Sequence, residues 1–148
     1  MITVTKKFSF CYGHRLPGYD GKCADFHGHN AEVEVEIAGW DENGYPTMVI
    51  DFSKLKAIVN GLLLELDHKD LTEFFVTGPL AFCAGRFRKE TDGSYYRPAT
   101  AETICGWLTQ NIEAALPDGC RLERLRVTET PDSWAEYKAH VFIDGRTK

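Results

Sequence analysis

Two stretches of alternating apolar and polar residues at the start of the chain place the strongest constraint on its fold. Between residues 2 and 14 the even positions are mostly apolar, and between residues 27 and 37 the odd positions take over that role. A period of two is typical of a strand that buries one face and exposes the other. The segment 17–21 between the two stretches is rich in Gly and Pro and predicts a turn. The chain therefore begins with a pair of strands whose apolar face has to be covered.

Two amphipathic helices are predicted to follow this strand pair. Apolar residues recur over 55–66 at the spacing i, i+3, i+4, i+7, i+8 and i+11, and a second apolar set occupies 104–116. Thr100 is expected to be the N-cap of the second helix, which the Pro-Asp-Gly sequence at 117–119 ends. Each helix has one apolar face that can pack on the sheet.

Alternation returns at 125–129 and at 135–143, on either side of a turn. The resulting order ββααββ predicts an α+β fold, an antiparallel four-stranded sheet with both helices on one face. The length suits a single domain over residues 1–148, in which the segment 70–98 has no clear period and is expected to be an irregular insertion. The free edges of such a sheet favour pairing with sister subunits, so a homo-oligomer is expected.

The charge and the cysteine content exclude several classes of protein. The 17 Lys and Arg residues stand against 22 Asp and Glu residues, so binding to nucleic acid or to a membrane surface is not expected. No run of about 18 apolar residues and no signal-peptide pattern occurs, which predicts a cytoplasmic protein. The five cysteines are an odd number without a CxxC spacing, which predicts reduced thiols rather than a disulfide framework.

Three histidines are the candidate metal ligands. His27 and His29 lie two positions apart and so share one face of an extended segment, and His14 lies on the buried parity of the first strand. Three imidazole nitrogens with an open fourth position are typical of a catalytic zinc site. Two alternatives are ordinary core histidines and a structural zinc module with a fourth ligand such as Cys11 or His140.

Cys23, Asp67 and His68 are candidate acid-base residues. Cys23 precedes the first histidine of the His-Gly-His sequence by four residues, so it can face the same pocket and act as a general base where a nearby cation favours the thiolate. The alternative is a small buried side chain. Asp67 and His68 end the first helix and can form a pair in which the carboxylate orients an imidazole that moves protons. The alternative for this pair is an exposed helix terminus.

Glu129 is unusual because a carboxylate occupies the inward parity of the strand at 125–129, where an unpaired charge is costly. It is expected to have a partner in the protein or in a ligand, unless the strand end reaches solvent. Glu102 lies two residues after Thr100 and is by default a favourable charge in the first turn of a helix.

Taken in order, these residues resemble the 6-pyruvoyl-tetrahydropterin synthase and 6-carboxytetrahydropterin synthase family. The resemblance covers nearly the whole chain and rests on His14, CxxxHGH at 23–29, Val-Ile-Asp-Phe at 49–52, Leu-Asp-His at 66–68, Thr-Ala-Glu at 100–102 and Thr-Glu-Thr-Pro at 128–131. It implies a tunnelling-fold (T-fold) subunit that assembles as a homohexamer of two trimers, with sites between subunits. The roles that it implies are zinc binding by His14, His27 and His29, a base at Cys23, a proton relay at Asp67 and His68, a relay and pterin anchor at Glu129, and a pterin pocket lined by Thr100 and Glu102.

The activity that the resemblance implies is a zinc-dependent lyase reaction on 7,8-dihydroneopterin triphosphate. Its products are 6-carboxy-5,6,7,8-tetrahydropterin, acetaldehyde and triphosphate. The sequence Glu-Thr-Pro-Asp-Ser at 129–133 favours this product, a deazaguanine precursor in queuosine biosynthesis, and 6-pyruvoyl-tetrahydropterin formation is the alternative. A non-catalytic zinc-containing pterin-binding oligomer is a further alternative, which the retention of Cys23 disfavours. Three departures from the family pattern concern the rim of the pocket: a longer connection at 70–98, Leu71-Thr72 after the Asp-His pair, and the Pro-Ala-Thr spacing at 98–100.

Overall fold

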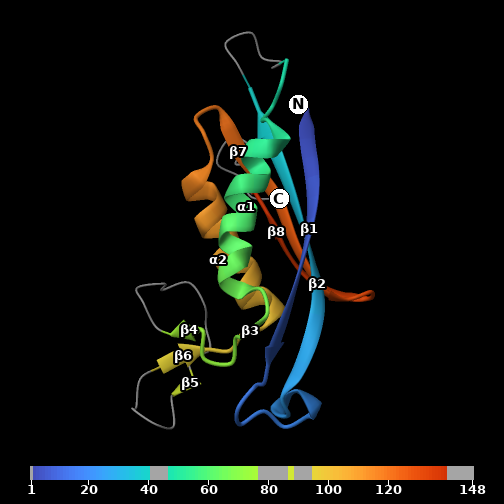
Figure 1. Cartoon of the computed structure of the whole chain (residues 1–148), viewed down its shortest axis with the longest axis vertical. Coiled ribbons are helices and arrows are strands. Elements are labelled where there is room, and N and C mark those ends of the chain that lie inside the picture. The colour runs from blue at the N-terminus through green and yellow to red at the C-terminus, as the bar shows by residue number, and fades with distance from the viewer. Residues whose placement is uncertain (1, 41–46, 77–86, 89–94, 140–148) are drawn as a thin grey trace, which may run out of the picture.

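The computed structural model describes residues 2–40, 47–76, 87–88 and 95–139 of the chain. Its main sheet has five strands in the order β3-β1-β2-β7-β8 (Figure 1). The bounds are Thr3–His14 for β1, His27–Gly39 for β2, Lys69–Asp70 for β3, Cys120–Thr130 for β7 and Ser133–Lys138 for β8. Neighbouring strands are antiparallel except for β3, which pairs with β1 in parallel. The short helix η1, Lys22–Ala24, lies in the loop between β1 and β2.

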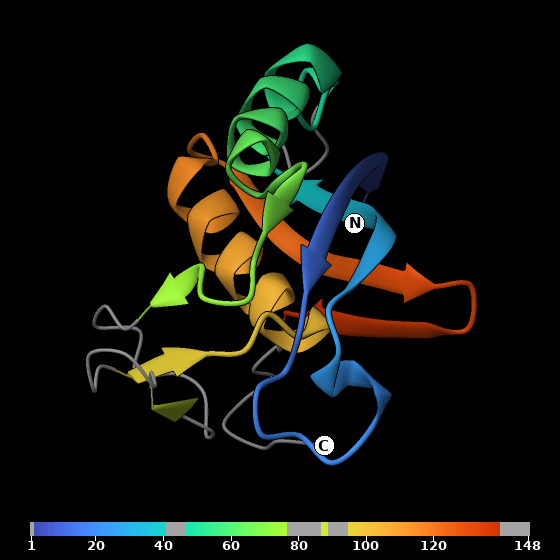
Figure 2. The same ribbon diagram turned by 60° about the horizontal axis from the view of Figure 1, so that its bottom comes forward.

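Two helices, α1 at Phe52–Leu66 and α2 at Ala101–Ala115, cover one face of this sheet (Figure 2). Each begins where a side-chain oxygen accepts a hydrogen bond from a free backbone N–H, at Asp51 for α1 and at Thr100 for α2. The predicted α+β class and the placement of both helices on one face are confirmed. The predicted number of four strands is wrong by one. The fifth strand, β3, has only two residues and pairs with β1 just after α1. A strand of two residues is too short to show an alternating pattern in the sequence.

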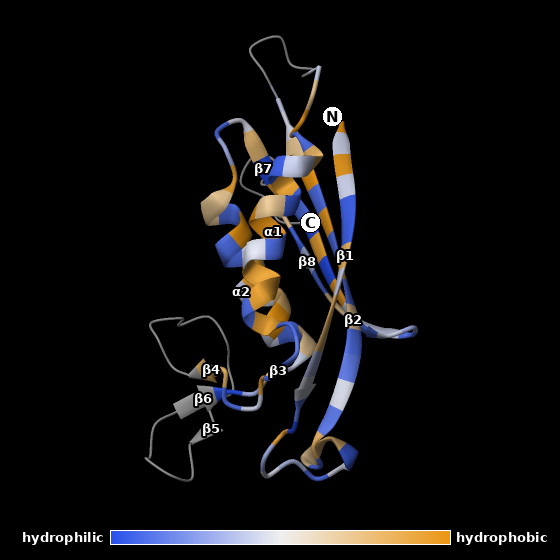
Figure 3. Cartoon of the chain, in the orientation of Figure 1, coloured by the Kyte–Doolittle hydropathy of each residue, from blue (hydrophilic) through white to orange (hydrophobic). Residues whose placement is uncertain are grey.

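The core lies between the helices and the sheet, where the orange hydrophobic segments of Figure 3 face one another. Its fully buried side chains include Val33, Val35, Ile37, Leu55, Val59, Leu66, Ile104, Leu108, Ile112, Leu122, Leu125 and Val127. The period-two and helical spacings in the sequence therefore correspond to the residues that are buried. No helix in the described part of the chain has the length and hydropathy needed to span a membrane.

The opposite face of the sheet carries a layer of charged side chains. Lys7 lies 2.7 Å from Glu34, and Arg124 lies 2.9 Å from Glu36 on the neighbouring strand. These cross-strand pairs explain why Glu alternates with apolar residues along β2.

The described parts of the segment 70–98 include three short strands. They are β4 at Phe75–Val76, β5 at Phe87–Arg88 and β6 at Tyr95–Arg97, in the order β4-β6-β5. The interpretation of residues 1–148 as one domain with an insertion at 70–98 stays a prediction. The strand predicted at 135–143 is described to Lys138, and its last residues, with the alternative ligand His140, lie outside the described residues.

Candidate active site

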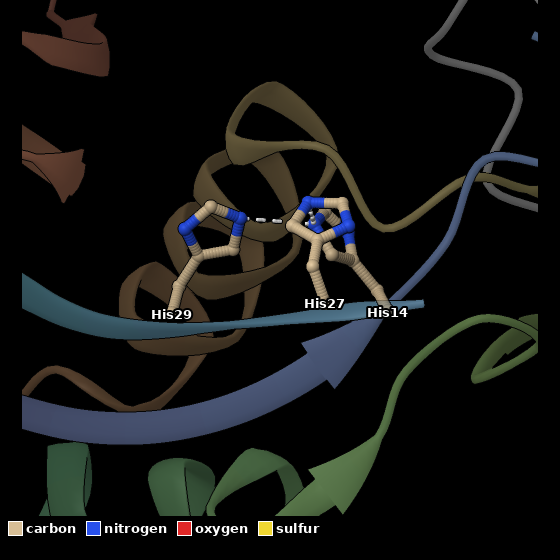
Figure 4. Close-up of side chains that lie close together, drawn as sticks. All are labelled: His14, His27 and His29. Carbon is tan, nitrogen blue, oxygen red and sulfur yellow. Dashed lines mark hydrogen bonds between the residues drawn. The ribbon is translucent and has the colours of Figure 1, made fainter. Parts of the chain in front are cut away.

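Three imidazoles meet at the end of the β1–β2 pair. His14 lies directly opposite His27 in the strand register, and His29 follows two residues later on the same face of β2. Nε2 of His14 lies 3.1 Å from Nε2 of His27 and 3.1 Å from Nε2 of His29, and the three rings turn these atoms toward one another (Figure 4). The predicted convergence of these three residues on one point is therefore present in the fold.

Backbone carbonyls orient two of these rings. Nδ1 of His14 lies 2.6 Å from the carbonyl oxygen of Ala99, and Nδ1 of His27 lies 2.8 Å from that of Asp25. A carbonyl oxygen only accepts, so both Nδ1 atoms carry the proton and both Nε2 atoms present a lone pair. Burial is the main cause that lowers the pKa of His14, which is 3% exposed, and so favours its neutral form.

This donor set fits a zinc ion. Two Nε2 lone pairs at 3.1 Å repel each other unless a cation or a proton lies between them. Neutral imidazoles whose second nitrogen is bound to a carbonyl are the usual zinc-binding form of histidine. Among the described residues, only these three imidazoles form this cluster. Cys11, an alternative fourth ligand, belongs instead to a different cluster with Asp67 and His68.

Glu129 has a partner within the chain that the sequence did not predict. The hydroxyl of Tyr12 donates a hydrogen bond to Oε1 of Glu129 near the end of β7. The Tyr12 ring is 3% exposed, and its centroid lies 5.2 Å from that of His14 and 5.4 Å from that of His29. Burial and this hydrogen bond raise the pKa of the Tyr12 hydroxyl far above its ordinary value. Glu129 is thus linked to the imidazole cluster through one aromatic ring.

Asp67 and His68 form a pair at the end of α1. Nδ1 of His68 lies 2.9 Å from Oδ2 of Asp67, and Oδ1 of Asp67 accepts a hydrogen bond of 2.8 Å from the backbone N–H of Cys11. These bonds lower the pKa of Asp67, the backbone bond from Cys11 contributing most. The His68 side chain is 78% exposed and is not part of the three-histidine cluster. The carboxylate-imidazole pair that the sequence predicts at 67–68 is therefore present, outside the three-histidine cluster.

Cys23 lies in η1, in the loop that joins His14 to His27. Its carbonyl oxygen accepts a hydrogen bond of 2.7 Å from the backbone N–H of Leu16, which closes this loop. The thiol is half-buried and is not grouped with the donor atoms of the three imidazoles. Cys23 therefore lies in the loop that connects the two strand ends carrying the cluster.

The start of α2 is attached to the imidazole cluster. Thr100 accepts a hydrogen bond of 3.3 Å from the N–H of Thr103, while the preceding residue, Ala99, holds the ring of His14. Glu102 is exposed in the first turn, where a negative charge interacts favourably with the helix dipole. Sequence reasoning missed Tyr12 and the carbonyl of Ala99. The inward parity of Tyr12 was visible in the alternation, whereas a backbone carbonyl gives no sequence signal.

Comparison with known proteins gives consistent matches over the chain. A family model described as 6-pyruvoyl tetrahydropterin synthase matches residues 3–140. The 6-carboxy-5,6,7,8-tetrahydropterin synthase of Haemophilus influenzae is 33% identical over 143 residues, which covers 93% of this chain and 99% of that protein. A protein of the same description from Synechocystis is 33% identical over 141 residues and covers 93% of both chains. The structure of Caenorhabditis elegans 6-pyruvoyl tetrahydropterin synthase superposes with a TM-score of 0.66 at 24% identity, over 94% of this chain and 96% of that one.

Proposed function

The chain belongs to the 6-pyruvoyl tetrahydropterin synthase family, and we propose that it is a zinc-dependent lyase acting on 7,8-dihydroneopterin triphosphate. The proposed products are 6-carboxy-5,6,7,8-tetrahydropterin, acetaldehyde and triphosphate, in the branch that supplies queuosine biosynthesis. The observation that carries the metal-dependent chemistry is the convergence of three Nε2 atoms, two of whose rings are oriented by backbone carbonyls. The descriptions of the relatives favour the 6-carboxy product over the 6-pyruvoyl alternative.

His14, His27 and His29 are the proposed zinc ligands. Zinc in this position would acidify the C–H and O–H groups next to the substrate oxygens that it polarises. A fourth position left for the substrate is consistent with the three donor atoms found among the described residues.

The acid-base work is assigned to residues of the chain itself. Cys23 is the proposed base that removes a proton from the substrate side chain, which its place in the loop beside the imidazoles supports. His68 is the proposed second proton carrier, and Asp67 orients its ring through the bond between Oδ2 and Nδ1.

Glu129 is proposed to bind the amino-pyrimidinone edge of the pterin. The adjacent N–H groups of that edge can both donate to one carboxylate. Thr100 and Glu102 are proposed to line the same pocket.

A homohexamer with sites between subunits accounts for the separation of His68 from the imidazole cluster. A side chain that is 78% exposed, on a backbone held by hydrogen bonds to β1, is suited to serve the site of a neighbouring subunit. Light scattering tests this arrangement, and a monomer at micromolar concentration would contradict it.

Product identification by mass spectrometry tests the reaction. Purified protein loaded with zinc is incubated with dihydroneopterin triphosphate, and we expect the 6-carboxy product together with acetaldehyde. Accumulation of the 6-pyruvoyl compound without acetaldehyde would assign the alternative synthase activity. Binding of substrate without any product would assign a non-catalytic pterin-binding oligomer. The variant His27→Ala is the control for turnover that does not depend on the cluster.

A further inference from the structure

A second cluster of metal-ligating atoms shares no residue with the three-histidine cluster. Sγ of Cys11, a carboxylate oxygen of Asp67 and a ring nitrogen of His68 all lie within 4.8 Å of one another. Cys11 precedes Tyr12 in β1, so its side chain projects from the face of the strand opposite to Tyr12 and His14. Its thiol donates a hydrogen bond of 3.1 Å to Oδ1 of Asn30, its register partner on β2.

The backbone holds these residues in fixed positions relative to one another. The N–H of Cys11 donates to Asp67, and the carbonyl oxygen of Cys11 accepts a hydrogen bond of 2.6 Å from the N–H of His68. His68 has a φ of 58°, the left-handed region that a residue with a side chain rarely adopts. Backbone outliers of this kind persist where the surrounding structure holds them, and they gather at binding and catalytic sites.

The cluster is accessible to an ion from solvent. Cys11, Asn30 and His68 line a cavity of about 440 Å³. The imidazole is 78% exposed, so there is room for it to turn and bring its donor nitrogen to the spacing that an ion requires. One thiolate, one imidazole and one carboxylate suit a borderline divalent cation such as Zn²⁺ or Co²⁺, and the amide oxygen of Asn30 is a further donor beside the thiol.

We propose that Cys11, Asp67 and His68, with Asn30 beside them, form a second site for a borderline divalent cation. The ion replaces the thiol proton of Cys11, which leaves to solvent, and it takes the place of the proton between Oδ2 of Asp67 and Nδ1 of His68, which moves to Nε2 of the same ring. If Asp67 and His68 are the relay described under the proposed function, occupation of this site separates the carboxylate from the proton that the pair transfers. Zinc beyond one ion per chain then inhibits the enzyme.

Cobalt titration of the metal-free protein tests the site without reference to turnover. The three-histidine cluster has no thiolate, so a thiolate-to-cobalt charge-transfer band reports the second site. We expect two cobalt ions per chain and the band in the wild type, and one ion without the band in Cys11→Ser. His27→Ala should keep the band, since it removes only the first site. Cys23→Ser is the matched control and should also keep it, and Mg²⁺ should not displace the cobalt.

A band that persists in Cys11→Ser, is lost in Cys23→Ser, or never forms in the wild type would overturn the site. Inhibition is measured separately, as the zinc concentration that halves turnover. Removal of a ligand should raise this concentration in Cys11→Ser by about tenfold or more. Equal inhibition of both proteins would overturn the link to the relay. The cobalt result decides the site even if the protein has no synthase activity.

Discussion

Tyr12 on β1 donates its hydroxyl to Glu129 on β7, a residue 117 positions away in the chain. Strand β2 lies between them in the sheet, and the Tyr12 ring packs beside His29 on that strand. The inward carboxylate that appears unpaired in the sequence is therefore hydrogen-bonded before any ligand binds. A ligand that pairs with Glu129 has to share it with Tyr12.

Tyr12→Phe should lower the free energy of unfolding by about 1–3 kcal/mol, because a partly buried carboxylate loses its donor. Denaturation in urea measures this change. Tyr137→Phe is the matched control, since the hydroxyl of Tyr137 donates to Glu113 at an exposed position, and it should change stability by less than about 0.5 kcal/mol. Equal effects of the two substitutions would mean that the bond to Glu129 contributes nothing particular.

Glu129→Gln should weaken the binding of a non-reactive pterin analogue by about tenfold to several hundredfold, because an acceptor is replaced by a donor facing the N–H groups of the ligand. Calorimetric titration of folded, zinc-loaded protein gives the affinity. Glu102→Gln, in the first turn of α2, is the comparison for loss of a negative charge near the same pocket. Unchanged affinity in Glu129→Gln would mean that Glu129 has only a structural role, as the hydrogen-bond acceptor of Tyr12.

His27→Ala and His29→Ala should each lose the tightly bound zinc of the three-histidine site, since two imidazoles remain of a three-ligand set. Metal analysis after gel filtration provides the measurement, with about one zinc ion per chain expected in the wild type. His68→Ala should keep that ion because its ring is not part of this cluster. Full zinc content in both His27→Ala and His29→Ala would rule out the assignment.

Cys23→Ala should keep its fold and its zinc but lose about 10²–10⁴-fold in turnover, the usual effect of removing a general base. The matched control is Cys120→Ala, whose thiol donates a hydrogen bond to the carbonyl of Val49 and has no proposed role in catalysis. Loss of zinc together with activity in Cys23→Ala would identify the thiol as a ligand instead.

The ion pairs of Glu136 on the charged face of the sheet should make the free energy of unfolding depend on pH below about 4.5. Hydrogen bonds from Lys138 and Arg126 lower the pKa of Glu136 from its ordinary value of 4.5 to about 2. A carboxyl whose pKa is lower in the folded state stabilises that state above pH 4.5 and loses this contribution as the pH falls from 4.5 to 2. Glu136→Gln should therefore flatten the decline of the unfolding free energy over this interval.

Urea denaturation at several pH values measures this decline, and Glu65→Gln on the exposed side of α1 is the control. The effect should be modest because the Lys138 side chain is 71% exposed and water screens its charge. An identical slope in wild type and Glu136→Gln would contradict the prediction.

The periodicity of the sequence is enough to predict the two helices, the four long strands and the faces that they bury. Val33, Val35 and Ile37 were recognisable as core residues because a strand alternates its side chains and this periodicity is a local property. The same parity placed His14, His27 and His29 on one face, and the β1–β2 register brought them to one point. The motif CxxxHGH and the later Asp-His and Glu-Thr pairs pointed to the family, which the comparisons show.

The identity of the hydrogen-bond partners, in contrast, depends on how the elements pack together. The bond from Tyr12 to Glu129, the carbonyl of Ala99 on His14 and the contact of Cys11 with Asp67 each join residues far apart in the chain. Such contacts depend on strand order, on register and on the direction in which the chain leaves a helix. The left-handed backbone of His68 and the two-residue strand β3 both lie in the segment that follows α1. The local spacing of residues cannot predict these contacts, because they form between groups that meet only after the sheet and the helices have packed.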